Sequence, residues 1–295
     1  MENKQGIIIK AISGFFYVEA GDAVYECKAR GHFRKDGITP LVGDTVTILP
    51  GENFKGVIGE ILPRNNFLER PPIANIDRLL IVAASADPKP NTLVLDRLTA
   101  IAEDHEIEPV IVINKTDLQN ADWLKSIYDT AGIETHMVSC VTGEGIEELK
   151  QTLIGKINVF SGNSGVGKSS LLNRIDPQFK LPTGEISEKL GRGRHTTRHV
   201  ELYKLPAGGY VADTPGFSSV DMEKCGWIVK ENLPFAFREF LPFLSSCRFS
   251  SCSHTGEKGC AICKAVKQGK IHESRHNSYV ALYKEAEAVK DWQRK

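Results

Sequence analysis

The amino-acid sequence predicts a multidomain α/β protein with three parts. Short strand-like runs separated by turn residues fill residues 1–68, which predicts a small β-barrel. Strands and helices alternate over residues 69–225, as is typical of a parallel sheet covered by helices. Cysteine and histidine gather in residues 226–295, where a helical metal-binding domain is expected. A chain of 295 residues has room for all three.

The charges of the whole chain cancel, with 37 basic and 37 acidic side chains, so the balance excludes no class of partner. By segment the net charge is 0 for 1–68, −5 for 69–225 and +5 for 226–295. No apolar run approaches the roughly 20 residues that a membrane helix needs, and the N-terminus lacks the apolar core of a signal peptide. We therefore expect a cytoplasmic protein without a membrane partner, in which clustered cysteines bind metal rather than form disulfides. A monomer is expected as well, although the sequence does not determine the oligomeric state.

The N-terminal segment favours an OB-type barrel, because its strands are short and no helical period interrupts them. The basic stretch Lys28–Lys35 is either a loop that holds RNA phosphates or a solvated loop of a spacer domain. The predicted strands are Gly6–Ile12, Phe15–Ala20, Val24–Ala29, Asp44–Leu49 and Gly56–Leu62.

The central segment begins with the buried-strand run Ile76–Ala84, continues with a helical pattern over Leu93–Glu106, and returns to a strand at Pro109–Ile113. Further along, a helix around Trp123–Tyr128 precedes a strand at His136–Val138. This βαβ succession places ligands at the carboxyl ends of the strands.

A base-reading motif follows the second of these strands, at Asn114, Lys115 and Asp117. A carboxylate here can accept both the ring N–H and the exocyclic amine of guanine, so the motif predicts GTP rather than ATP. Ser139 and Cys140, after the next strand, take the position of the small-residue loop that backs the guanine ring.

A phosphate-binding loop is predicted at 162–169, between the apolar run Ile157–Phe160 and a helical pattern. Its glycines let backbone N–H groups turn toward an anion, Lys168 reaches the β and γ phosphates, and the Ser169 hydroxyl binds Mg²⁺. The predicted contacts are Gly162, Asn163, Ser164, Gly165, Val166, Gly167, Lys168, Ser169 and Ser170.

Two later stretches complete a nucleotide site. In the basic stretch 190–198, Thr196 or Thr197 can complete the Mg²⁺ shell when a γ-phosphate is present. A strand at Tyr210–Ala212 leads to Asp213, which would hold Mg²⁺ through water, and to Gly216, whose N–H would meet the γ-phosphate.

The expected metal site lies in the spacing C-x₄-C-x-H-x₅-C of Cys247, Cys252, His254 and Cys260. Three thiolates and an imidazole suit a structural, tetrahedral Zn²⁺. Cys263 extends the pattern to C-x₂-C and is an ambiguous fifth member.

A terminal helix is predicted after this cluster, with an apolar stripe for core packing and a basic face that either meets RNA or is solvated. The stripe is Tyr279, Leu282, Tyr283, Ala286 and Val289, and the basic residues are Lys264, Lys267, Lys270, Arg275 and Lys284.

The order of these motifs is unusual, because the base-reading elements precede the phosphate loop instead of following it. Because of this order, together with the Arg-His-Thr-Thr stretch and the metal cluster, the whole chain resembles one known family. This is the ribosome small subunit-dependent GTPase A (RsgA) family of circularly permuted GTPases. The resemblance implies an OB domain, a permuted P-loop GTPase domain and a zinc domain whose ligands stop at Cys260. It also implies a GTP hydrolase that binds the 30S subunit and 16S rRNA and acts in late maturation.

The catalytic residues are expected to be Lys168, Thr197 and His195. Phe217 stands where many GTPases carry a water-orienting glutamine, and a phenyl ring cannot take that role. His195 is the nearest candidate, and the resemblance points to it as well; contact with rRNA or solvent is the alternative. A stand-alone signalling or metabolic GTPase and a passive rRNA-binding scaffold remain the alternative functions.

Overall fold

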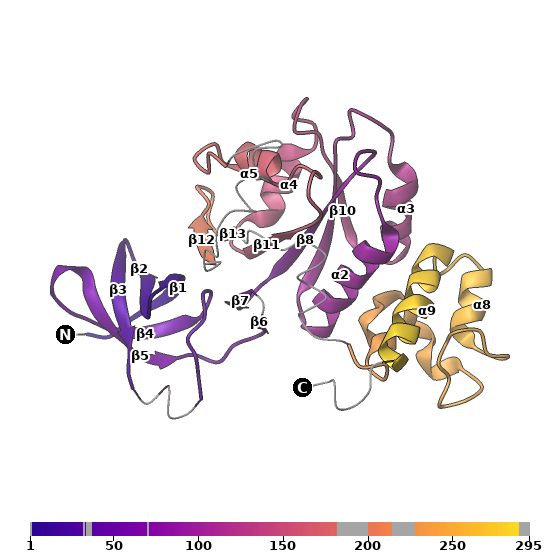
Figure 1. Ribbon diagram of the computed structural model, residues 1–295, viewed down its shortest axis with the longest axis horizontal. Helices are drawn as coiled ribbons and strands as arrows, with labels where there is room; N and C mark the ends of the chain where they lie inside the picture. The colour runs from indigo at the N-terminus through magenta and orange to yellow at the C-terminus, as the bar shows by residue number, and fades with distance from the viewer. Residues whose placement is uncertain are drawn as a thin grey trace. The chain divides into compact units, whose positions relative to one another are not determined.

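The computed structural model describes residues 2–31, 33, 37–69, 71–181, 200–213 and 228–288 (Figure 1). The chain forms two compact units, which are described one after the other. The first consists of Met1–Arg78, Leu153–Phe160 and Gly193–Gly216, and the second of Leu79–Thr152, Ser161–Arg192 and Phe217–Lys295. The three-domain boundaries expected from the sequence stay a prediction.

The N-terminal strands close into a barrel, which confirms the predicted architecture. Strand β1 pairs with both β2 and β4, and β2 pairs with β3. Strand β5 closes the barrel, because it pairs with β3 in parallel and with β4 in antiparallel orientation. Alternate residues point inward, and Ile8, Val18 and Ile48 are completely buried. The bounds are β1 (Lys4–Ile12), β2 (Phe15–Ala20), β3 (Ala23–Ala29), β4 (Thr45–Pro50), η1 (Glu52–Phe54) and β5 (Lys55–Ile61).

The first unit also contains strands from the far side of the chain. Strand β13 (Tyr210–Asp213) runs parallel to β11 (Ile157–Ser161) and forms an antiparallel hairpin with β12 (Glu201–Lys204). Strand β12, in turn, pairs with β1 of the barrel at Glu201 and Lys10. The sequence did not predict β12, because four residues are too short for a clear alternation. A small ladder of β6 (Phe67–Glu69) and β7 (Pro72–Ala74) follows the barrel.

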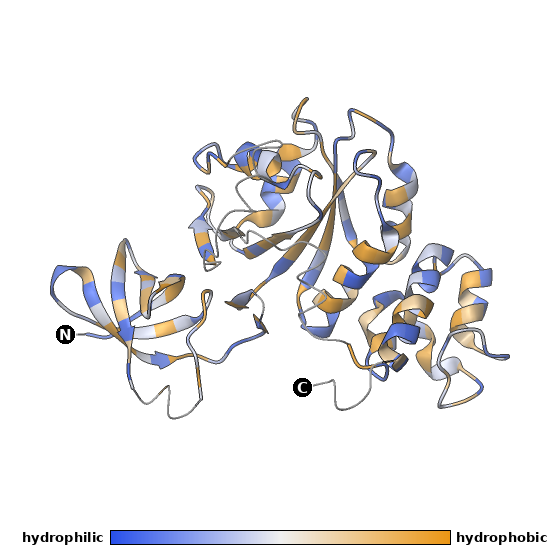
Figure 2. Ribbon diagram, in the orientation of Figure 1, coloured by the Kyte–Doolittle hydropathy of each residue, from blue (hydrophilic) through white to orange (hydrophobic). Residues whose placement is uncertain are grey.

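The second unit is built around β8, β9 and β10, which lie side by side in the order β10, β9, β8. Strands β8 and β9 are buried except for their first residues and carry the hydrophobic colour in Figure 2. The predicted alternation of strands and helices is confirmed. The bounds are β8 (Arg78–Ala84), α2 (Thr92–Asp104), β9 (Glu108–Asn114), α3 (Asp122–Thr130), β10 (Glu134–Met137), α4 (Ile146–Leu153) and α5 (Lys168–Ile175).

The C-terminal elements are η2 (Leu233–Ala236), η3 (Arg238–Ser246), α8 (Ala261–Lys267) and α9 (Glu273–Ala288). They enclose an aromatic core of Phe237, Phe240 and Tyr279, to which helix α2 contributes Ala100. The predicted stripe on α9 is confirmed as core packing for its described members; Val289 lies outside the described residues. No helix of the described ranges is both long and apolar enough to cross a membrane.

Arg275 does not belong to the basic face on which the sequence placed it, since only 1% of it is exposed. Its guanidinium donates to both carboxylate oxygens of Glu239, at 2.7 and 3.2 Å, and to Asp96 Oδ1 at 2.9 Å. A further bond of 2.8 Å reaches the hydroxyl of Thr99, and the ring of Phe237 covers the charge. Two carboxylates distant in sequence therefore hold Arg275 inside, between α2, η3 and α9.

We expect Arg275→Ala to destabilise the second unit by about 3–5 kcal/mol, because Asp96 and Glu239 would stay buried without a countercharge. Denaturant unfolding measures the difference. Arg97→Ala is the matched control: its pair with Glu285 is partly exposed and should be worth about 1 kcal/mol or less. An equal decrease in the free energy of unfolding in the two variants would contradict a special role of the buried ion pairs of Arg275.

Candidate functional site

The phosphate loop connects β11 to α5, and two of its glycines lie against the backbone of Val82 and the side chain of Asn114. Gly162, at φ +147°, leaves no room for a side chain, because a Cβ there would lie 2.3 Å from the carbonyl oxygen of Val82. Gly167, at φ +93°, is equally constrained, with a Cβ position 2.4 Å from Asn114 Nδ2. Both glycines are needed for positive φ and for close approach. Gly167 is also the N-cap of α5, and no side chain caps that helix end, which leaves its first N–H groups for an anion.

Lys168 is the first residue of α5, and its ammonium group folds back over the loop. It donates to the carbonyl oxygens of Gly162 and Asn163, the latter at 2.9 Å. Burial lowers the pKa of Lys168 to about 8. A partly buried cation beside a helix N-terminus is well suited to phosphate oxygens.

Asn114 joins the base-reading motif to the phosphate loop. Only 1% of Asn114 is exposed at the end of β9, where its amide donates to the carbonyl oxygen of Val166 at 2.9 Å. Its Oδ1 accepts a long bond of 3.4 Å from the backbone N–H of Cys140. Three predicted contact segments, far apart in sequence, therefore meet at one amide side chain.

Asp117 is oriented by Ser139, whose hydroxyl donates to Asp117 Oδ1 at 2.5 Å. The same hydroxyl accepts from the N–H groups of Val141 and Thr142, at 3.2 and 3.1 Å. Lys115, at φ +64°, extends its ammonium to the carbonyl oxygen of Asp87. The carboxylate of Asp117 is thus held in place before any base arrives.

Arg174 is a supporting residue that the sequence reading missed. From the last turn of α5 it donates to the carbonyl oxygens of Cys140, at 2.7 Å, and Val141, at 3.2 Å. It ties the helix that starts at the phosphate loop to the loop expected behind the guanine ring. No local pattern marks it, because its partners are backbone atoms more than 30 positions away. Cys140 itself is half-buried, and burial raises the pKa of its thiol, which fits a packing role.

The remaining predicted nucleotide contacts are only partly described. His195, Thr196, Thr197 and Gly216 lie outside the described residues. Asp213 is the last residue of β13, next to Ala212, which pairs with Val159 of β11.

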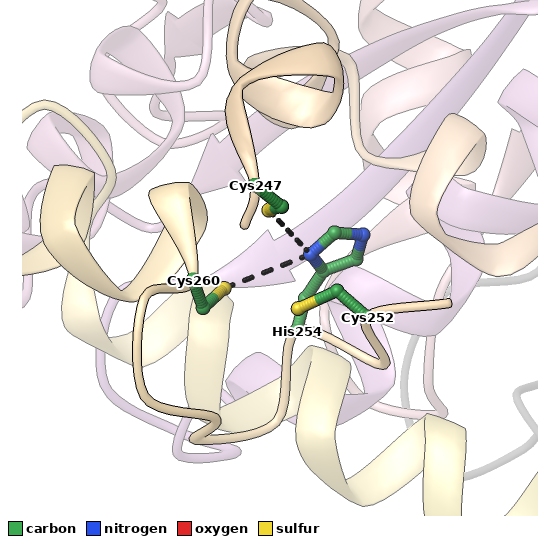
Figure 3. Close-up of side chains that lie close together, drawn as sticks. All are labelled: Cys247, Cys252, His254 and Cys260. Atoms are coloured by element: carbon green, nitrogen blue, oxygen red, sulfur yellow. Dashed lines mark hydrogen bonds between the residues drawn. The ribbon is translucent and has the colours of Figure 1, made fainter. Parts of the chain in front are cut away.

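The four predicted metal ligands come together in the C-terminal region (Figure 3). The thiol sulfurs of Cys247, Cys252 and Cys260 and a ring nitrogen of His254 all lie within 4.8 Å of one another. His254 Nδ1 lies 3.5 Å from Cys247 Sγ and 3.6 Å from Cys260 Sγ. Tetrahedral Zn²⁺ with ordinary Zn–S and Zn–N bonds separates such atoms by about 3.6 Å, so the arrangement fits that ion.

Cys263, the ambiguous fifth thiol, is not part of this group. Its Sγ lies 3.9 Å from the carbonyl oxygen of His254, and its backbone N–H donates to Cys260 Sγ. Burial raises the pKa of Cys252 to about 12 and of Cys260 to about 11, so a cation is needed to make these neighbouring thiols ionise together.

Glu257 organises the loop that carries the cluster and was not predicted. It accepts from the N–H groups of Ser253 at 2.6 Å, Thr255 at 3.0 Å and Gly256 at 3.1 Å. Burial alone would raise the pKa of Glu257, but these bonds and the Ser253 hydroxyl lower it to about 2. An ionised carboxylate thus closes the turn between Cys252 and Cys260.

Comparison with known proteins covers nearly the whole chain. The model of the RsgA GTPase family matches residues 61–223, and that of the RsgA N-terminal domain matches residues 5–58. A relative from Caldanaerobacter subterraneus subsp. tengcongensis, named small ribosomal subunit biogenesis GTPase RsgA, is 48% identical over 97% of this chain and 96% of its own.

Two solved structures are similar over nearly their full length. One is YjeQ from Thermotoga maritima, with a TM-score of 0.84 and 37% identity over 98% of this chain and 100% of that one. The other is YloQ, described as a circularly permuted GTPase, with a TM-score of 0.81 and 36% identity over 98% of this chain and 96% of that one. These matches confirm the permuted P-loop fold that the order of the motifs indicated. The chain belongs to the RsgA GTPase family.

Proposed function

We propose that this protein is a GTP hydrolase that binds the 30S ribosomal subunit and its 16S rRNA, and times a late step of subunit maturation. The family match along the full length carries this proposal, since the 48% identical relative is named for small-subunit biogenesis. The chain would act as a monomer in the cytoplasm.

In this proposal the nucleotide lies over the loop 162–169, with guanine read by Asp117 and phosphates held by Lys168 and the N-terminus of α5. The tether between Asn114 and Val166 supports it, because it fixes the distance between base reader and phosphate loop. Mg²⁺ would be held by Ser169, Thr196 or Thr197, and Asp213, and would neutralise the charge of the phosphates. Hydroxyl and carboxylate oxygens are ligands that suit Mg²⁺.

Hydrolysis in this proposal depends on His195 to orient the attacking water, because Phe217 cannot. Gly216 would contact the γ-phosphate through its N–H. The domains 1–68, 69–225 and 226–295 would serve as RNA-binding barrel, GTPase and zinc domain, with one structural Zn²⁺ on Cys247, Cys252, His254 and Cys260.

The function is tested by measuring GTP turnover with and without 30S subunits, and 30S affinity with GDP and with a non-hydrolysable GTP analogue. We expect faster turnover with subunits, and tighter binding by about 5- to 150-fold in the GTP form, the usual range of coupling between two sites. Full turnover without subunits would instead indicate a stand-alone GTPase. Affinity that ignores the nucleotide would indicate a passive scaffold.

Base recognition is tested with Asp117→Asn, which keeps an acceptor for the Ser139 hydroxyl but presents an amide donor to the base. We expect GTP affinity to fall by about 100-fold or more and xanthine nucleotides to be preferred. Asp129→Asn, in an exposed pair with Lys125 on α3, is the control and should bind GTP normally. Unchanged GTP affinity in Asp117→Asn would remove Asp117 from the site.

The low pKa of Lys168 predicts a pH dependence of GDP binding. Phosphate favours the ammonium form, whose pKa of about 8 in this fold lies below its usual range. Below that pH the charge is already present, and above it binding must take up a proton. Affinity should therefore be flat between about pH 7, above which the terminal phosphate is fully ionised, and about pH 8, and should then fall by up to about tenfold per pH unit. Lys168→Ala should bind weakly without this slope, and the same slope in that variant would contradict the assignment.

Metal binding is tested by metal analysis of Cys252→Ala beside Cys263→Ala. We expect Cys252→Ala to lose zinc and to unfold locally around 247–260, because metal binding stabilises that small loop region. Cys263→Ala should keep its zinc, since that thiol lies outside the cluster. A full complement of zinc in Cys252→Ala, or none in the unaltered chain, would refute the site.

A further inference from the structure

Two side chains of helix α9 bind the backbone of the metal loop, residues 252–260. His276 Nε2 lies 2.8 Å from the carbonyl oxygen of His254, and because a carbonyl oxygen only accepts, the histidine is the donor. The hydroxyl of Tyr279 donates to the carbonyl oxygen of Ser253, also at 2.8 Å. His276 and Tyr279 are three positions apart on α9 and therefore lie on the same face of the helix. One helix thus holds two successive carbonyl groups of the metal loop.

The backbone that is held in this way has an unusual conformation. His254 has a φ of +59°, in the left-handed region that residues other than glycine rarely adopt. Such a conformation persists where the surrounding contacts fix it. The carboxylate of Glu257 accepts from the N–H groups of Ser253 and Thr255, at 2.6 and 3.0 Å, which flank His254 in the chain. Bonds to α9 and to Glu257 together fix the peptide groups around His254.

The conformation of His254 directs its ring toward the other ligands (Figure 3). His254 Nδ1 lies 3.5 Å from Cys247 Sγ and 3.6 Å from Cys260 Sγ. The Cα–Cβ bond turns with φ relative to the preceding peptide group, so a negative φ would point the ring in another direction. The left-handed backbone of His254 is therefore a requirement of the cluster.

Helix α9 is itself fixed in the core of the second unit. Arg275, which precedes His276, donates to the buried carboxylates of Glu239 and Asp96. The ring of Tyr279 is completely buried and packs edge-on against Phe237, with 5.4 Å between the ring centroids. The two donors to the metal loop therefore extend from a support that is anchored independently of any metal ion.

We propose that His276 and Tyr279 are positioning residues for the metal ion, which hold His254 in the conformation that a ligand of the cluster needs. Neither belongs to the group of four ligands, so each acts through the backbone of the loop. This inference rests on the proposed metal site. When a protein without its ligand leaves the binding conformation, the apparent affinity falls by the fraction of molecules that keep it. The two bonds from α9 raise that fraction.

The test measures the zinc affinity of the full chain by competition with a zinc-binding dye. Tyr279→Phe keeps the buried ring and removes only the hydroxyl, and His276→Leu removes the other donor. We expect each variant to bind zinc about tenfold more weakly than the unaltered chain, the lower end of the range for residues that hold metal ligands. His276→Gln places an amide donor near the same carbonyl oxygen, and should bind zinc at least about threefold more tightly than His276→Leu.

Tyr283→Phe is the matched control, because it makes the same change on the same helix. The ring of Tyr283 lies 6.0 Å from that of Tyr279, and within residues 228–288 no hydrogen bond joins its hydroxyl to the metal loop. Zinc affinity in this variant should be normal. Unchanged affinity in Tyr279→Phe and His276→Leu, no recovery in His276→Gln, or an equal loss in Tyr283→Phe would overturn the positioning role. An unaltered chain that binds no zinc would refute the proposed metal site itself, and this inference with it.

Discussion

The buried amide of Asn114 is the contact on which the nucleotide site depends. Its Nδ2 binds Val166 of the phosphate loop, its Oδ1 accepts from Cys140, and Gly167 approaches so closely that no side chain fits between them. An unpaired buried amide costs roughly 1–3 kcal/mol, so the three segments are stable only when all of them meet. The base reader and the phosphate loop are therefore joined by tertiary contacts, although the chain connects them in a permuted order.

This explains why permutation leaves the site intact. The phosphate loop follows β11 and the base-reading motif follows β9, and neither loop needs the other as its chain neighbour. What fixes their separation is the bond from Asn114 and the bond from Arg174 to Cys140, which are tertiary contacts. Moving the chain ends changes which loops are covalently joined, but it removes neither of these bonds.

The sequence predicted those parts of the molecule that are encoded locally. The phosphate loop, the base-reading motif and the spacing of Cys247, Cys252, His254 and Cys260 are short patterns whose residue types follow from their chemistry. The barrel and the alternating strands and helices follow from periodicity in the same way.

Arg275 was misplaced because its partners, Asp96 and Glu239, are 179 and 36 positions away and no local pattern marks a buried charge. Arg174 and Glu257 were missed because each bonds mainly to backbone atoms, which every residue offers. Strand β12 was missed because β1 and β13, rather than its own four residues, determine it.

The C-terminal region contacts α2, and the barrel contacts the β12–β13 hairpin, through physically different interactions. The C-terminal region is fixed to α2 by Arg275, a charge with 1% exposure, and by the apolar core around Phe237. The first turns of α2 share a cavity with Gly162 and Val166 of the phosphate loop, so one helix joins that loop to the metal-binding region.

The barrel, by contrast, holds the β12–β13 hairpin through side chains of which Lys10 and Glu201 are about one third exposed. Water and salt screen exposed pairs much more than buried ones, and an exposed pair contributes at most about 1 kcal/mol. The connection through α2 therefore persists under conditions that loosen the connection through the hairpin.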